Sequence, residues 1–276
     1  MEIMKKKKWS GERLETFILT RDAVDHLHRY AIAKTYVKNK IVLDIACGEG
    51  YGSNLLREEA SSVFGVDIDN ETIEKAKLKY KKDNLLFQQG TTSAIPLEDN
   101  SVDVVVSFET IEHHDEHNEM MAEIKRVLKP EGITIISTPD KYYYSDDGNF
   151  KNEFHIKELY KDDFENLIRK SFSNVQLLTQ KFVNGNSVVQ DEESHKEIKF
   201  YNGSYLKIKE EKGIPMYLIV IASDSTFEKQ SITIFNELEF ARENQEILIS
   251  NIRKSTTFRI GYAILTPFQF IKKLFK

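Results

Sequence analysis

Two acidic and two histidine side chains lie within seven residues of the sequence, in the stretch FETIEHH at residues 108–114. This stretch follows the apolar run VDVVVS, which is typical of a buried strand. Glu109, Glu112 and His113 have the i, i+3, i+4 spacing that places side chains on one face of a helix. Carboxylates and imidazoles gathered in this way can move a proton or bind a divalent cation. The stretch is therefore a candidate catalytic site.

A further histidine that can join this site is His155, in the segment NEFHIKEL. The segment follows the fifth expected strand, and neighbouring strands of a doubly wound sheet bring their carboxyl ends together. Two other interpretations remain open. A histidine can act as a base without a metal, or the acids can occupy a first helical turn only because the helix dipole favours negative charge there. His114 and His117 fit the structural interpretation, as solvated side chains.

The bulk composition limits the class of protein. The chain has 276 residues, of which 40% are apolar and 30% charged, as in ordinary folded globular proteins. The formal net charge of −5 argues against broad capture of nucleic acid, and we expect no nucleic-acid partner. The single cysteine, Cys47, excludes an intramolecular disulfide and suits a reducing compartment. No run approaches the roughly 20 apolar residues of a membrane span, so we expect a cytoplasmic protein.

Strand-like and helix-like segments alternate from about residue 40 onward. Strands are expected at KIVLDIA, SVFGVDID, LLFQQG, VDVVVSF and GITIISTP, and helices at GSNLLREEA, NETIEKAKLKYKK and NEMMAEIKRVLKPEG. Asn70 is the expected N-cap of the second helix, and Pro130 and Gly132 are expected to end the third. Such alternation predicts a parallel sheet covered on both faces, an α/β Rossmann-like doubly wound fold.

Further elements flank this core. A helix is expected within residues 16–37, and later strands at NVQLLTQKF and MYLIVIAS are separated by a polar insertion at residues 184–212. A short heptad pattern follows, formed by Ile234, Leu238, Ala241, Gln245, Leu248 and Ile252. We predict an N-terminal lid at residues 1–39, a core domain at 40–223 and a helical C-terminal extension at 224–276.

The turn after the first expected strand is the candidate ligand-binding loop. In IVLDIACGEGYG, Asp44 ends the strand, and the glycines of the turn let the backbone approach a ligand closely. The spacing is G-x-G-x-G instead of the dinucleotide pattern G-x-G-x-x-G. Glu49 inside this loop would repel phosphate but suits a sulfonium and an α-ammonium group. Asp67, at the end of the second strand, is placed to accept both hydroxyls of a ribose.

Together these motifs resemble the class I S-adenosylmethionine-dependent methyltransferases. The resemblance rests on VLDIACGEGYG, VFGVDID, GTTSAIPLEDNSVDVVVSFETIEH and IKRVLKPEGITIISTP, and it covers about residues 35–180. It implies the strand order 3-2-1-4-5-7-6 with an antiparallel seventh strand, and S-adenosylmethionine as the methyl donor. The implied donor-binding residues are Asp44, Ala46, Gly48, Gly50, Asp67, Ile68, Thr91, Thr92, Ser107 and Phe108.

The E-x-x-E-H pattern with a distant histidine resembles the metal site of small-RNA 2'-O-methyltransferases and the matching stretch of ubiquinone-pathway O-methyltransferases. It implies a site for a divalent metal such as Mg²⁺ or Mn²⁺. The implied ligands are Glu109, Glu112, His113 and His155. An alcohol keeps its proton far above neutral pH, so methyl transfer to oxygen needs a base or a metal. Glu109, His113 and His155 are therefore the expected catalytic residues.

A narrower resemblance indicates the acceptor. The segments GERL, HLHRY, ACGEGYGS, SFETIEH, STPDKYYYSD and NEFHIKEL are together similar to methyltransferases of bacterial surface-polysaccharide assembly. This implies O-methylation of a sugar hydroxyl of a cell-surface glycan or its precursor. Residues available to the sugar or a phosphate are Glu12, Arg13, His28, Arg29, Tyr142, Tyr143 and Tyr144. Alternatively, Arg29 pairs with an acid and the tyrosines belong to the core.

Other functions remain open at this point. The same donor can serve a catechol-like or quinone-type acceptor, or RNA, which the acidic pI near 5.9 disfavours. A non-catalytic scaffold that binds S-adenosylmethionine is the alternative of another class. The tail RIGYAILTPFQFIKKLFK mixes apolar residues with lysines. We expect this tail either to contact a membrane surface peripherally or to dock in a homodimer.

Overall fold

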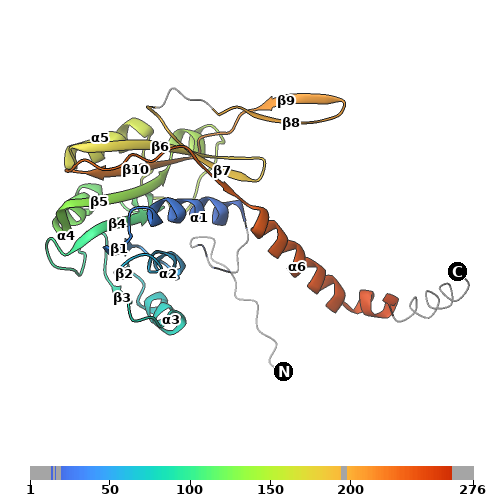
Figure 1. The fold of residues 1–276 in the computed structure, drawn as a ribbon, viewed down its shortest axis with the longest axis horizontal. Helices are drawn as coiled ribbons and strands as arrows, with labels where there is room; N and C mark the ends of the chain where they lie inside the picture. The colour runs from blue at the N-terminus through green and yellow to red at the C-terminus, as the bar shows by residue number, and fades with distance from the viewer. Residues whose placement is uncertain (1–13, 15, 17–19, 194–197, 263–276) are drawn as a thin grey trace, which may run out of the picture. The chain divides into compact units, whose positions relative to one another are not determined.

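The computed structural model describes residues 14, 16, 20–193 and 198–262. Contacts divide the chain into two units, Met1–Phe235 and Asn236–Lys276. Within the described residues, the first unit is built on a nine-stranded sheet with the order β11-β7-β6-β10-β5-β4-β1-β2-β3 (Figure 1). The division between lid, core and extension drawn from the sequence stays a prediction.

Five parallel strands form one half of this sheet. They are β1 (Ile41–Ile45), β2 (Ser62–Asp67), β3 (Leu85–Gln89), β4 (Val102–Phe108) and β5 (Leu128–Pro139). Their spatial order is 3-2-1-4-5, because β1 pairs with β2 and β4, β2 with β3, and β4 with β5. All four pairings within this half are parallel, so the carboxyl ends of the five strands meet at one edge of the sheet.

Antiparallel strands complete the sheet. β10 (Tyr217–Ser223) lies between β5 and β6 (Asn174–Val183) and is antiparallel to both. The predicted order 3-2-1-4-5-7-6 is therefore confirmed, with β10 as the antiparallel seventh strand. The sheet extends beyond that prediction, because β7 (Asn186–Asp191) pairs with β6 and β11 (Thr233–Asn236) follows at the edge.

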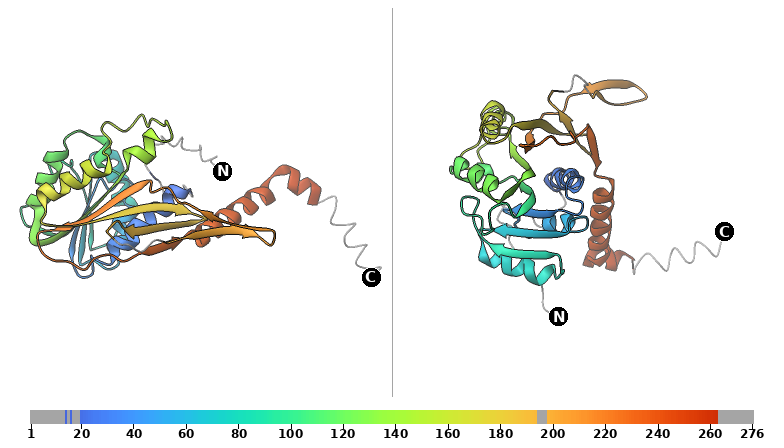
Figure 2. Two further views of the ribbon diagram at one scale, coloured as in Figure 1. Left: turned by 90° about the horizontal axis from the view of Figure 1, so that it is seen from above. Right: turned by 60° about the vertical axis from the view of Figure 1, so that its left-hand side comes forward.

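Helices cover both faces of the sheet (Figure 2). One apolar cluster contains residues of α1 (Arg21–Lys34), α2 (Tyr51–Leu56) and α3 (Asn70–Lys79). The other contains residues of α4 (His117–Val127) and α5 (Lys161–Ser171). The central strands contribute to both clusters, which explains why β1 and β4 are apolar along most of their length.

Two predicted helix ends were wrong. The N-cap of α3 is Asp69 and not Asn70, since its carboxylate accepts hydrogen bonds from the N–H groups of Glu71 and Thr72 at 2.9 and 3.4 Å. Aspartate and asparagine are about equally good N-caps, so composition could not separate them. The helix α4 ends at Val127, before the predicted proline and glycine, because the chain pairs with β4 from Leu128 onward.

The predicted insertion at residues 184–212 contains β7 and a separate hairpin. β8 (Phe200–Ser204) and β9 (Lys207–Glu211) pair only with each other among the described strands. Tyr205 and Leu206, at the turn between them, are fully exposed.

The second unit contains α6 (Leu238–Lys254), none of whose residues is buried. Ile234 lies in β11, so the predicted heptad pattern can begin in a helix only at Leu238. Most of the amphipathic tail lies beyond residue 262, outside the described residues. Among the residues that the structure describes, no helix has both the length and the apolar character to cross a membrane. The homodimer and the peripheral membrane contact stay predictions.

Candidate active site

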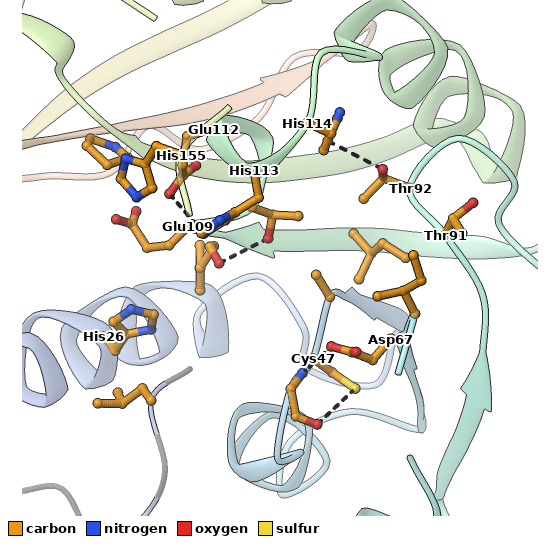
Figure 3. Close-up of a pocket in the computed structure, with 18 of the residues that line it drawn as sticks. His26, Cys47, Asp67, Thr91, Thr92, Glu109, Glu112, His113, His114 and His155 are labelled. Atoms are coloured by element: carbon orange, nitrogen blue, oxygen red, sulfur yellow. Dashed lines mark hydrogen bonds and ion pairs between the residues drawn. The ribbon is translucent and has the colours of Figure 1, made fainter. Parts of the chain in front are cut away.

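A cavity of about 420 Å³ lies at the carboxyl ends of the parallel strands (Figure 3). Its walls come from the loops after β1, β2, β3 and β4, and from parts of α1, β5 and β10. The segment Asn152–His155, far along the chain, reaches the same cavity. This is the edge at which open parallel sheets bind ligands.

The loop after β1 is tied to the end of β2. Ala46 and Gly48 both have left-handed backbone conformations, with φ of 61° and 53°. The N–H of Gly48 donates to Asp67 Oδ2, and the N–H of Asp69 donates to Asp67 Oδ1, each at 2.9 Å. Each carboxylate oxygen can accept a second hydrogen bond. Asp67 is therefore held in place and can still accept hydroxyl groups from the cavity that it lines.

Most of the predicted donor-binding residues line the cavity. They are Ala46, Gly48, Asp67, Ile68, Thr91, Thr92 and Phe108. Asp44, Gly50 and Ser107 do not line it. Asp44 and Ser107 are buried behind it, and a Cβ added at Gly50 would lie 2.7 Å from the Phe87 ring. These three residues shape the loop and the sheet instead of facing the cavity.

Asp44 is a buried carboxylate held by two hydroxyl groups. Ser53 Oγ donates to it at 2.6 Å and Tyr30 Oη at 3.3 Å. Burial raises the pKa of Asp44 from 3.8 to about 7, and the two hydroxyl donors offset this only in part. Tyr30 thus links α1 to the carboxyl end of β1.

Replacing Asp44 with Asn is expected to flatten the pH dependence of the unfolding free energy. The folded chain keeps a proton on Asp44 up to about pH 7, whereas the unfolded chain releases it near 3.8. The wild-type protein therefore loses stability as the pH rises through this window, by an amount on the order of 4 kcal/mol. Urea unfolding of both proteins across this range tests the prediction, and parallel curves would contradict it.

Glu49 lines the cavity, but its charge is paired. Lys79 Nζ lies 2.8 Å from Glu49 Oε1, and the N–H of Thr16 donates to Oε2 at 2.8 Å. Lys79 therefore offsets part of the negative charge that Glu49 was predicted to present to a sulfonium or ammonium group.

Glu112, His113 and His155 converge on one side of the cavity (Figure 3). One potential ligand atom from each lies within 4.8 Å of the others. The two imidazole rings meet edge to face, with centroids 5.1 Å apart. Glu112 is buried and accepts a hydrogen bond from Thr138 Oγ1 at 3.1 Å. Burial, and then the charge of Glu109, raise the pKa of Glu112 well above its ordinary value.

Glu109 does not share a helix face with Glu112 and His113, so that prediction was wrong. Its φ of 52° lies outside any helix, and only Ile111–His113 form a short 3-10 helix. The N–H of Glu109 still pairs with the Ser137 carbonyl at 3.1 Å, so the strand pairing continues past the point where the spacing placed a helix. Glu109 lines the cavity but lies outside the Glu112, His113 and His155 group.

The carboxylate of Glu109 is held by Arg29. Arg29 Nη1 lies 3.2 Å from Glu109 Oε1, and Ser137 Oγ donates to the same oxygen at 2.6 Å. Arg29 is itself buried, donates from Nε to Gln180 Oε1 at 2.7 Å, and lies 4.4 Å from the centroid of the Tyr217 ring. Arg29 therefore pairs with an acid, as the structural alternative expected, and also packs on an aromatic ring.

His28 is also part of the interior. Its ring nitrogens lie 3.0 Å from Ser187 Oγ and 2.9 Å from Thr233 Oγ1. Burial, and then the charge of Arg29, lower the pKa of His28 to about 4, so this histidine is neutral at physiological pH. Glu12 and Arg13, the other residues proposed for a sugar, lie outside the described residues.

Of the three consecutive tyrosines, only Tyr144 lines the cavity. Tyr144 lines the cavity and stacks on the His155 ring, with centroids 5.2 Å apart. Tyr142 and Tyr143 do not line the cavity. These residues belong to a short π-helix, Tyr142–Asp146, which interrupts the regular side-chain spacing.

His114 and His117 were expected to be solvated, but both make contacts inside the fold. His117 is buried, and its Nε2 donates to the His114 carbonyl at 2.8 Å, at the start of α4. His114 lines the cavity, and its Nε2 lies 3.4 Å from Thr92 Oγ1. Helix spacing alone could not reveal either contact.

Several lining residues were missed as site residues by sequence reasoning. They include Asp22, His26, Tyr30, Tyr51, Gly90, Ser93, Asn152 and Tyr217. His26 and Tyr30 lie in the motif HLHRY, and Asn152 lies in NEFHIKEL. Their position inside these motifs could have identified them as site residues. Tyr217 had no such signal, because its place depends on the pairing of β10 with β5.

Comparisons with known proteins agree with this geometry. Residues 43–136 match the family model described as a methyltransferase domain. The chain is 38% identical over 119 residues to a probable S-adenosylmethionine-dependent methyltransferase of Mycolicibacterium smegmatis, covering 43% of this chain and 46% of that protein. It is 34% identical over 106 residues to a ubiquinone biosynthesis O-methyltransferase of Pelagibacter ubique, covering 38% and 44%. The matched part spans about half the length of these curated relatives.

A solved structure shows the same fold. It is described as an S-adenosylmethionine-dependent methyltransferase, possible histamine N-methyltransferase, from Thermotoga maritima. The TM-score is 0.54 at 18% identity, and the match covers 74% of this chain and 91% of that one.

Proposed function

We propose that this chain, whose core is a class I S-adenosylmethionine-dependent methyltransferase domain, transfers a methyl group to a sugar hydroxyl of a cell-surface glycan or its precursor. One observation carries the proposal of O-methylation. A single cavity contains both the glycine loop with Asp67 and the group formed by Glu112, His113 and His155. A methyl donor and a device for removing a proton are the two requirements of methyl transfer to oxygen.

The donor end of the cavity fits S-adenosylmethionine, which supplies an electrophilic methyl group when bound. Asp67 is oriented by two backbone N–H groups and has acceptor capacity for ribose hydroxyls. Ile68 is 63% exposed beside it, so its side chain is available to an adenine face. Thr91, Thr92 and Phe108 complete this end.

Glu112, His113 and His155, at the opposite end of the cavity, can remove the proton of the acceptor hydroxyl. The imidazole of His113 or His155 can accept it directly through a ring nitrogen. The donor set also fits a divalent cation, because Glu112 is a buried carboxylate whose Oε1 lies 4.0 Å from His113 Nε2. Glu112, His113 and His155 would hold such a cation, which would lower the pKa of an acceptor hydroxyl.

The lining near this end supports a hydroxyl-rich acceptor. Asp22, His26, Asn152 and Glu109 offer polar atoms, and Tyr144 offers an aromatic ring. Sugars combine many hydroxyl groups with a ring face that packs on aromatic side chains. An acceptor of the catechol or quinone type is the second candidate, because one relative is named a ubiquinone biosynthesis O-methyltransferase.

The test is an assay of the purified chain with methyl-labelled S-adenosylmethionine and Mn²⁺ against nucleotide sugars, surface glycans and catechols. Methylated sugar is the expected product, and methylated catechol alone would favour the second candidate. Binding of the donor without release of S-adenosylhomocysteine from any acceptor would favour a non-catalytic protein.

Removal of divalent metal is expected to reduce turnover by at least about a hundredfold, and added Mn²⁺ to restore it. The physical reason is that Glu112, His113 and His155 offer one carboxylate and two imidazoles within 4.8 Å of one another. The measurement is S-adenosylhomocysteine release with and without EDTA. Turnover that is insensitive to EDTA would assign the proton to a histidine base instead.

A further inference from the structure

We propose that Glu158 is a positioning residue that fixes the tautomer of His155, with the proton on Nδ1 and the lone pair on Nε2. His155 lines the cavity, and Glu158 does not. Glu158 lies outside residues 43–136, the part of the chain that matches the methyltransferase family model. The hydrogen-bonding partners of the two His155 ring nitrogens determine which nitrogen carries the proton.

The Nδ1 side of the ring faces a carboxylate. His155 Nδ1 lies 2.5 Å from Glu158 Oε1, and the side chains are only 7% and 9% exposed. A carboxylate oxygen at this distance is an acceptor for a ring N–H. His155 Nδ1 therefore carries a proton.

The Nε2 side faces the amide of Asn152. Asn152 Nδ2 lies 3.0 Å from His155 Nε2. The orientation of this amide is set independently, because the N–H of Phe154 donates to Asn152 Oδ1 at 3.0 Å. Reversing the amide would place its NH₂ group against that N–H. The NH₂ group therefore faces the ring, and since it only donates, His155 Nε2 must accept.

Two neighbours on opposite sides of the ring thus require the same tautomer. The ring also has little freedom to turn over, because Tyr144 stacks on one face and His113 meets it edge to face. His113 follows the same rule, since its Nδ1 lies 3.0 Å from the Phe154 carbonyl, which only accepts. The segment from Asn152 to Glu158 therefore orients both histidines.

This orientation matters whether the site holds a metal or not. An unprotonated Nε2 is the atom that would bind a cation or accept the proton of a hydroxyl, in place of the hydrogen bond from the Asn152 NH₂ group. A carboxylate or carbonyl on the other nitrogen is the usual means of orienting such a histidine. The use of the lone pair rests on the proposed function, but the tautomer itself is a property of the free protein.

The first test measures the tautomer by long-range ¹H–¹⁵N NMR of the histidine rings in the full chain, without donor or metal. The His155 signals are assigned by their loss in His155→Ala. We expect a protonated Nδ1 and an unprotonated Nε2 in the wild-type protein. Because Asn152 favours the same tautomer, Glu158 is varied in the Asn152→Ala background. There, Glu158→Ala should shift the population toward the opposite tautomer, whereas Glu158→Gln should largely retain it, since the amide oxygen still accepts. Glu153→Gln is the matched control, because Glu153 is exposed on the same segment.

The second test is calorimetric titration of the same variants with Mn²⁺. Glu158→Ala is expected to bind Mn²⁺ about 10–100-fold more weakly than the wild type, with Glu158→Gln between them and Glu153→Gln unchanged. A wild-type His155 protonated on Nε2 overturns the inference, as does a Glu158→Ala substitution that leaves the tautomer population unchanged in the Asn152→Ala background. The expected tautomer in a protein that transfers no methyl group would refute the proposed function and leave the inference standing.

Discussion

Asp67→Ala is expected to weaken the binding of S-adenosylmethionine by at least about a hundredfold. The Asp67 carboxylate lines the donor end of the cavity and is held by the N–H groups of Gly48 and Asp69. A hydrogen bond to a charged group contributes about 1.5–3 kcal/mol, and each 1.4 kcal/mol changes an affinity tenfold. Loss of two ribose contacts is therefore expected to dominate the affinity. Isothermal titration calorimetry on the purified chain measures the effect.

Asp69→Ala is the matched control for this experiment. Asp69 lies two residues away and caps α3 with its side chain, but it does not line the cavity. Its replacement is expected to lower the unfolding free energy by about 1 kcal/mol through loss of the N-cap. The affinity for S-adenosylmethionine should stay at the wild-type value. An Asp67→Ala variant that folds and binds the donor normally would rule out the proposed ribose contact.

His155→Ala is expected to reduce turnover by about a hundredfold to ten-thousandfold, which is the usual contribution of a positioned acid–base group. The imidazole lies beside Glu112 and His113 at the acceptor end of the cavity, and its loss removes either the base or one metal ligand. The affinity for S-adenosylmethionine should not change, because His155 does not belong to the donor loop. Turnover is measured as S-adenosylhomocysteine released, and donor affinity by calorimetry.

His117→Ala is the control for His155→Ala. His117 is also a histidine near the same 3-10 helix, but it does not line this cavity, and its Nε2 contacts the His114 carbonyl. It should therefore retain turnover. If His155→Ala kept full turnover, neither His155 as the base nor His155 as a required metal ligand would survive. Together, the Asp67 and His155 variants separate donor binding from chemistry.

Local patterns were sufficient to predict the central sheet and the donor loop. The alternation of apolar runs with amphipathic segments identifies β1 to β5 and the helices between them, because burial on both faces requires nearly continuous apolar strands. The same patterns place Asp67 at a strand end and Gly48 in a turn. These features depend on neighbouring residues, so the sequence alone determines them.

Long-range contacts decided the rest of the site. The pairing of Glu109 with Arg29 joins residues 80 positions apart, and it overrides the helix spacing that grouped Glu109 with Glu112. The tautomer of His155 depends on Asn152 and Glu158, whose side chains meet the ring only in the folded loop. The spacing of residues along the chain does not show which buried acid pairs with a basic side chain. The packing of α1 against the sheet decides this, because it brings Arg29 to Glu109. The sequence by itself therefore determined the central parallel sheet and the glycine loop after β1, and the tertiary structure decided which acids and histidines line the proposed acceptor end of the cavity.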